Sequence, residues 1–179
     1  MKKNVLVFGL IAGVIVSTFM AFTAAHCHDD SDFSSNMVLG YAAMILSFSF
    51  IFIGVKNFRD KYNGGLLSFG KAFRIGLYIT LIASSMYVAV WLVEFYMFIP
   101  DFMEKYAAHV LRETKASGVG QLELDKKTVE MARYKELYKN PIFVILLTYM
   151  EILPVGLIIS LITALLLKRK RPPALAVGK

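Results

Sequence analysis

Four long apolar stretches, separated by polar segments, dominate the pattern of the chain. They cover residues 4–25, 37–55, 75–99 and 142–167. A helix needs about 20 apolar residues to cross the hydrocarbon core of a bilayer, and each stretch reaches or nearly reaches that length. The pattern predicts an all-α, polytopic membrane protein in which residues 1–170 form one domain with four transmembrane helices. Residues 171–179 are predicted to be a basic tail.

The first stretch also allows a second interpretation, because a basic start precedes it and Thr23-Ala24-Ala25 ends it. These features loosely resemble a cleaved signal peptide. The apolar part of a signal peptide is usually about 7–15 residues long, and this one is longer. We therefore favour an uncleaved membrane helix.

The polar segment at residues 101–140 is long enough for two further helices. Asp101 and Glu104 form a helix start, Gly118 a stop, and a second helix runs from about residue 121 to Asn140-Pro141. A segment of about 40 residues buries little apolar surface by itself. We expect a helical hairpin that rests on the bundle or on a partner.

The charge distribution predicts the orientation of the helices. The chain is 57% hydrophobic and carries a net charge of +7. Its lysines and arginines concentrate before the first stretch, between the second and third, and after the fourth, whereas residues 26–36 contain neither. Because Lys and Arg are retained on the cytoplasmic side, both termini are predicted to be cytoplasmic and the hairpin extracytoplasmic. The lipid bilayer explains the positive charge, so no nucleic-acid partner is expected.

A polar stripe follows one face of the third stretch. Its members are spaced by four or three residues, which places them on one side of a helix: Thr80, Ser84, Tyr87, Trp91 and Glu94. Polar groups are costly in lipid, so the stripe should face the bundle interior. In the fourth stretch, Glu151 lies at a depth similar to that of Tyr87 and Trp91.

These residues form a candidate intramembrane polar network of Glu151, Glu94, Trp91, Tyr87 and Ser84. Intramembrane carboxylates commonly mark functional sites, but a hydrogen-bonded network that fixes helix packing is the alternative. Both interpretations stay open for Glu151. For Glu94, which lies nearer the interface, we favour the structural one.

Small residues recur along the first two stretches. Gly9, Gly13 and Ser17 are spaced by four residues, and Gly40 and Gly54 lie on a second stripe. Small residues let helices approach closely in lipid. We favour packing within the monomer, and a homodimer through Gly9-x-x-x-Gly13 is the alternative.

The loop "HCHDDSD", at residues 26–32, contains residue types that bind metals. Adjacent side chains diverge, so the spacing is too tight for one tetrahedral site. We favour an incidental polar loop over weak divalent-metal binding, and we expect no metal or cofactor. Cys27 is the single cysteine, which excludes an intrachain disulfide. His109 is expected to be an exposed imidazole, and no nucleophile with a neighbouring base suggests an enzyme.

Three segments resemble a known family. The stretches "GGLLSFGKAF" at 64–73, "PDFMEKYAAHVLRETKASG" at 100–118 and "EILP" at 151–154 are similar to domain-of-unknown-function family 4199, small membrane proteins found mostly in Bacteroidota. The resemblance covers roughly residues 1–170. It implies a multi-pass protein of the bacterial inner membrane, with four membrane helices and an extracytoplasmic segment before the last. It implies no catalytic residue or cofactor.

Three functions are compatible with this pattern. The first is a non-enzymatic envelope scaffold or interaction protein, which docks an envelope partner through residues 101–140. The second is a small transporter or channel-like protein that uses Glu151 and Glu94. The least favoured is an intramembrane enzyme. Below Thr80 the third stretch is apolar until Arg74, which predicts a cavity closed on the cytoplasmic side.

Overall fold

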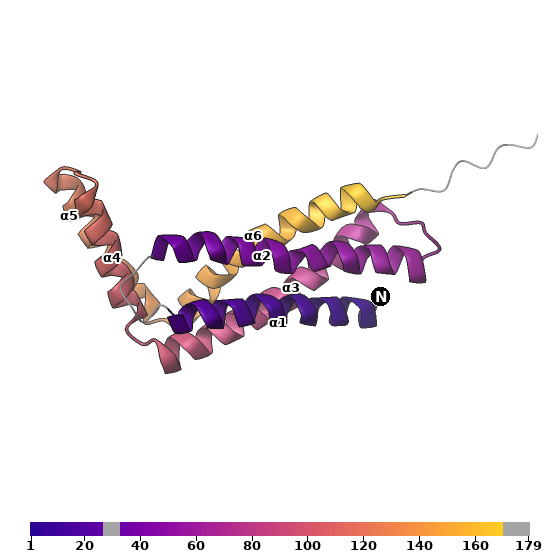
Figure 1. Ribbon diagram of the computed structural model, residues 1–179, viewed down its shortest axis with the longest axis horizontal. Helices are drawn as coiled ribbons and strands as arrows, with labels where there is room; N and C mark the ends of the chain where they lie inside the picture. Colours follow the sequence, from indigo (N-terminus) through magenta and orange to yellow (C-terminus); the bar gives the residue numbers. More distant parts are fainter. Residues whose placement is uncertain (27–32, 170–179) are drawn as a thin grey trace, which may run out of the picture.

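The computed structural model describes residues 1–26 and 33–169, and within them it contains helices and no strand. The long helices are α1 (Lys2–His26), α2 (Phe33–Asn57), α3 (Phe69–Val93) and α6 (Pro141–Leu167). Two shorter helices, α4 (Phe102–Ala116) and α5 (Gln121–Tyr138), form a hairpin at one end of the bundle (Figure 1). The predicted all-α chain with a helical hairpin between the third and fourth long helices is therefore present.

Four helices are long and apolar enough to cross a membrane, as the sequence predicts. The spans are Lys2–Thr23, Val38–Tyr62, Phe69–Phe98 and Pro141–Leu167. The second and third extend furthest beyond the predicted apolar stretches. The second continues at its end through the π-helical turn η1 (Phe58–Tyr62). The third begins earlier, at Phe69, and ends with the π-helical turn η2 (Glu94–Phe98). The chain thus has the architecture of a multi-pass membrane protein.

The helices form a four-cornered bundle. Helix α1 contacts α2 and α3, and α6 contacts the same two helices from the opposite corner. The N-terminus, the connection between α2 and α3, and the end of α6 lie together at one end (Figure 1). We call this the basic end, because Lys2, Lys56, Arg59 and Lys168 lie in or beside these segments. The opposite end, which carries α4 and α5, is the hairpin end.

Apolar side chains fill the bundle and also cover its outside. Phe48, Ile79 and Ile152 are completely buried in the core. In contrast, Leu46 on α2 and Leu166 on α6 are 65% and 69% exposed. An apolar outer surface on helices of this length suits lipid, because a helix forms its backbone hydrogen bonds within itself.

The small residues of α1 pack inside the monomer. A Cβ atom added to Gly9 would lie 2.8 Å from the Cβ of Ile82, and one added to Gly13 would lie 3.2 Å from the Cα of Ala83. Both neighbours belong to α3. The Gly9-x-x-x-Gly13 face is therefore covered by α3, which is the interpretation favoured from the sequence.

A backbone clamp closes the basic end. Leu67, just before α3, and Arg169, just after α6, exchange two backbone hydrogen bonds with N···O distances of 3.0 and 2.7 Å. Gly64 and Gly65 both have positive φ, which permits the tight turn that precedes Leu67. The clamp fixes the start of α3 beside the end of α6.

Candidate functional site

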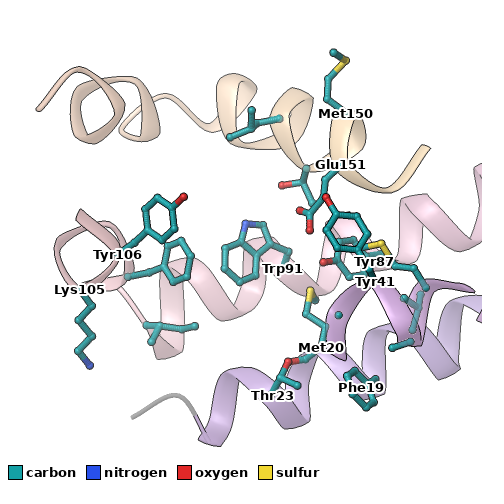
Figure 2. A pocket seen from close by; sticks show the side chains of 18 of the residues that line it. Phe19, Met20, Thr23, Tyr41, Tyr87, Trp91, Lys105, Tyr106, Met150 and Glu151 are labelled. Carbon is teal, nitrogen blue, oxygen red and sulfur yellow. The ribbon is translucent and has the colours of Figure 1, made fainter. Parts of the chain in front are cut away.

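A chamber of about 690 Å³ lies where the bundle meets the hairpin. All four long helices and α4 contribute to its wall. Phe19 and Met20 come from α1, Tyr41 from α2, and Trp91 from α3 (Figure 2). We use "the chamber" for this cavity throughout.

The chamber exists because the bundle is loosely filled at the hairpin end and tightly filled below it. Gly40 on α2 lines the chamber, and a Cβ atom built there would meet no atom within 4 Å. Met44 and Tyr87 form the floor and are almost completely buried. Beneath them, Phe48 and Ile79 fill the core. The cavity therefore does not continue toward the basic end.

Glu151 enters the chamber from α6. Its carboxylate points into the cavity, toward the side on which Tyr41 and Tyr87 lie (Figure 2). The side chain of Glu151 is exposed and lines the chamber. Within residues 1–26 and 33–169, its carboxylate has no hydrogen-bond or ion-pair partner.

The five residues of the predicted polar network divide between the chamber and its surroundings. Glu151, Trp91 and Tyr87 line the chamber. Ser84 is completely buried in the packed core, and Glu94 is buried at the junction of α3 and η2. In the described part of the chain, no hydrogen bond joins any two of the five.

Helix geometry explains this division. Ser84 and Glu94 share a face of the helix but lie about 15 Å apart along it, at 1.5 Å per residue. They therefore meet different neighbours. Ser84 Oγ and Glu94 Oε2 are both buried without a hydrogen-bond partner in the structure. The spacing of the polar residues predicted that the stripe faces the bundle interior, but it could not show which part of the interior is a cavity.

Aromatic side chains attach the hairpin to the bundle and form part of the chamber wall. The rings of Trp91 and Phe102 meet edge to face, with centroids 5.0 Å apart and an interplanar angle of 84°. The ring centroids of Phe95 and of Tyr138, on α5, are 5.6 Å apart. Such pairs typically add about 0.5–1.5 kcal/mol beyond the burial of apolar area. They hold α4 and α5 over the chamber.

Helix α4 supplies the charged rim of the chamber. Lys105 Nζ lies 3.0 Å from Asp101 Oδ2, and His109 Nε2 lies 3.5 Å from Glu113 Oε1. His109 is only 8% exposed, so the expectation of an exposed imidazole is wrong. The sequence predicted that the hairpin rests on the bundle or on a partner, but it did not show that the His109 face of α4 is buried. At the start of α4, Phe102 packs against Trp91 and Phe95.

The electrostatic effect of Glu151 reaches the hairpin. Burial, together with the negative charge of Glu151, raises the pKa of the Tyr138 phenol to about 12. Both effects disfavour the phenolate. Tyr138 and Glu151 therefore line the same chamber, and the charge of Glu151 acts on the Tyr138 phenol.

The described residues contain no metal centre. Within residues 1–26 and 33–169, no group of three His, Cys, Asp or Glu side chains is arranged to hold an ion. The "HCHDDSD" loop falls mainly on residues 27–32, which lie outside the described part of the chain. An incidental polar loop therefore stays the prediction there, with weak divalent-metal binding as the alternative.

Comparison with known proteins identifies one family. The family model described as "Protein of unknown function (DUF4199)" matches residues 7–169, which is most of the chain. No curated protein and no solved structure matches. The chamber is therefore interpreted from its own residues.

Proposed function

Because the chain belongs to the DUF4199 family, whose description assigns no activity, we propose a function from the chamber itself. The protein is a non-enzymatic, multi-pass protein of the bacterial inner membrane that binds a small apolar or amphipathic molecule. The chamber faces the extracytoplasmic side, together with the α4–α5 hairpin. Both termini lie in the cytoplasm.

The charge of the two ends supports this orientation. Lys56 in α2 and Arg59 in η1 belong to the connection between α2 and α3. That connection lies at the same end of the bundle as the N-terminus and the end of α6, beside which Lys2 and Lys168 stand in the sequence (Figure 1). Positive side chains next to membrane spans are retained in the cytoplasm. Residues 101–140 carry eight Lys and Arg, fewer than the twelve in the segments of the basic end, so the balance favours a cytoplasmic basic end. The chamber, which lies at the hairpin end, is then on the side away from the cytoplasm.

The single observation that carries the proposal is the size and lining of the chamber. Binding sites for small molecules are commonly about 300–1,000 Å³ in volume, mostly apolar, and contain a few polar groups that fix orientation. The chamber has a volume of about 690 Å³. Its walls are mainly aromatic and aliphatic, and Glu151 is the acidic group at the bundle side.

A channel is less well supported than a binding site. Phe48, Ile79 and Ile152 are fully buried below the chamber and leave no open path to the basic end. The alternative hypothesis, a transporter that uses Glu151 and Glu94, would need these side chains to separate during a transport cycle. A binding function needs no such movement.

Enzymatic activity is also less well supported. The hydroxyl of Thr148 in the chamber wall donates a hydrogen bond to the carbonyl of Val144 at 2.8 Å, one turn earlier in its own helix. Glu151 lies three residues later in the same helix, but among residues 1–26 and 33–169 no hydrogen bond joins this hydroxyl to a base, as nucleophilic catalysis requires. We therefore expect binding rather than catalysis.

Docking of an envelope protein through residues 101–140 is the second candidate function. Leu122 and Val129 on α5 are 71% and 69% exposed. They are seven residues apart and share one face of the helix. A photocrosslinking residue at Val129 should give a discrete crosslinked product in native membranes, whereas one at Glu123, which is exposed on another face of α5, should not. Equal products from both positions would argue against docking through this face.

Binding to the chamber can be tested with Trp91, which is the only tryptophan in the chain. N-phenylnaphthylamine, a neutral apolar fluorophore, should show saturable energy transfer from Trp91 in nanodiscs. The variant Gly40→Phe should fill the chamber and reduce this transfer. Val38→Phe is the control, because Val38 is 71% exposed on the same helix and does not line the chamber. Transfer that does not saturate, or that Gly40→Phe leaves unchanged, would contradict the proposal.

A further inference from the structure

We propose that the chamber selects hydrophobic organic cations, with Glu151 as the counter-charge and the rings of Tyr41, Tyr87 and Trp91 as the aromatic wall. This inference rests on the proposed function, namely that the chamber binds a small molecule. It adds the chemical class of that molecule.

The first argument is the position of the carboxylate. Glu151 reaches the chamber from α6, while the aromatic side chains enter from α2 and α3 (Figure 2). A ligand in the chamber would therefore contact the carboxylate and the rings together. Aromatic faces attract a cation through their quadrupole, most strongly where water is excluded.

The second argument is that the other charged groups of the chamber lie at its rim and already have partners. Lys105 pairs with Asp101, and Glu113 lies beside His109. Glu151 has no such partner within the described residues. A carboxylate removed from bulk water is costly to leave without a cation or a hydrogen-bond donor. A cationic ligand would supply the missing charge.

The third argument is that the lining of the chamber disfavours an anionic ligand. An anion in the chamber would meet the carboxylate of Glu151 at close range. The lysine that lines the chamber is Lys105, whose ammonium group is 3.0 Å from the carboxylate of Asp101. The lining thus disfavours an anion of the same size and shape. A neutral molecule would gain the apolar contacts but not the ionic one.

The test compares two ions of matched shape and opposite charge. Tetraphenylphosphonium and tetraphenylborate are titrated against the protein in nanodiscs of zwitterionic lipid, and quenching of Trp91 fluorescence is followed. The wild-type protein should show saturable quenching by the phosphonium ion at a concentration at least about tenfold lower than by the borate ion, since opposite charges separated by a few ångströms contribute this much or more. Equal affinity for the two ions, or tighter borate binding, would overturn the inference.

The variant Glu151→Gln identifies the source of the preference. It should weaken phosphonium binding by about tenfold or more and leave borate binding unchanged or tighter. Glu113→Gln is the matched control, because it removes a carboxylate at the rim and should keep the preference. A Glu151→Gln protein that still prefers phosphonium by the wild-type ratio would assign the selectivity elsewhere and contradict the inference.

A second variant tests the inference even if the Glu151→Gln protein does not fold. Tyr41 is 44% exposed, so Tyr41→Leu keeps an apolar wall without disturbing the core. It should weaken phosphonium binding several-fold and affect N-phenylnaphthylamine less. If the phosphonium ion and the neutral probe lose affinity equally, the ring acts only as apolar surface and the cation inference fails. If neither ion nor the neutral probe binds the wild-type protein, the proposed function fails as well.

Discussion

Thr80 on α3 and Ser160 on α6 share a hydrogen bond of 3.1 Å between their hydroxyl oxygens in the centre of the bundle. Both residues are completely buried. Glycines flank the pair: a Cβ atom added to Gly76 would lie 2.8 Å from Ser160 Oγ, and one added to Gly156 would collide with Thr80. This contact sets the distance between α3 and α6, the helices that carry Trp91 and Glu151 into the chamber.

The close approach at Gly156 predicts that even a methyl group there is harmful. Gly156→Ala should destabilise the protein by about 1–3 kcal/mol, as overpacked cores generally do. The loss is measured as a lower midpoint of thermal unfolding in detergent, followed by size-exclusion chromatography. Gly40→Ala is the control and should leave the midpoint unchanged or slightly raised, because nothing lies within 4 Å of the added atom and alanine favours the helix more than glycine does. Equal midpoints for the two variants would show that α3 and α6 do not meet as described.

The hydroxyl pair predicts a measurable coupling between the two helices. Thr80→Val keeps the shape of the side chain but leaves Ser160 Oγ without its partner. Hydrogen bonds between membrane helices contribute about 0.6 kcal/mol on average and up to about 1.7 kcal/mol. A double-mutant cycle with Ser160→Ala should give a coupling energy in this range. Thr128→Val is the control and should show no coupling with Ser160→Ala, since the Thr128 hydroxyl donates a hydrogen bond to the Leu124 carbonyl in its own exposed helix. Additive effects of Thr80→Val and Ser160→Ala would contradict the pairing.

The environment of Tyr138 predicts a loss of stability in alkali. Burial and the nearby charge of Glu151 raise the pKa of its phenol from 10.0 to about 12. The folded protein therefore holds the phenol proton more tightly than the unfolded chain does, so stability is unaffected below pH 10 and falls as the pH rises from 10 to about 12. The phenolate absorbance of the wild-type protein minus that of Tyr138→Phe should give this titration directly. A difference curve with its midpoint at 10 would show that Tyr138 is not buried beside the chamber.

The sequence predicted the membrane helices better than the site. The apolar length of α1 and α6 and the turn at Gly118 are local features, and each appears in the structure where the pattern indicates it. The inward orientation of Thr80 and Ser84 was also predictable, because lipid penalises polar groups wherever the helix lies. These inferences need no knowledge of which helices are neighbours.

The chamber could not be predicted because it depends on how distant segments pack. Gly40 leaves space on α2, while α4 lies across the hairpin end of the bundle and brings His109 into a buried position. Glu151 was expected among hydroxyl and indole donors, and in the structure it shares the chamber with Tyr87 and Trp91 without a hydrogen bond to either. Helical spacing shows the face on which a residue lies, but not whether that face meets a cavity or a packed neighbour.

The central claim is that the chamber and the hairpin face away from the cytoplasm, and its most direct test is labelling of single cysteines. Cys27 is the only native cysteine and is first replaced by serine. New cysteines are then placed at Val129 on α5 and at Tyr62 at the basic end, where the native side chains are 69% and 63% exposed. We predict that a membrane-impermeant maleimide labels the Val129→Cys protein in intact spheroplasts and labels the Tyr62→Cys protein only after lysis. Labelling of Tyr62→Cys in intact spheroplasts, with Val129→Cys protected until lysis, would contradict the account.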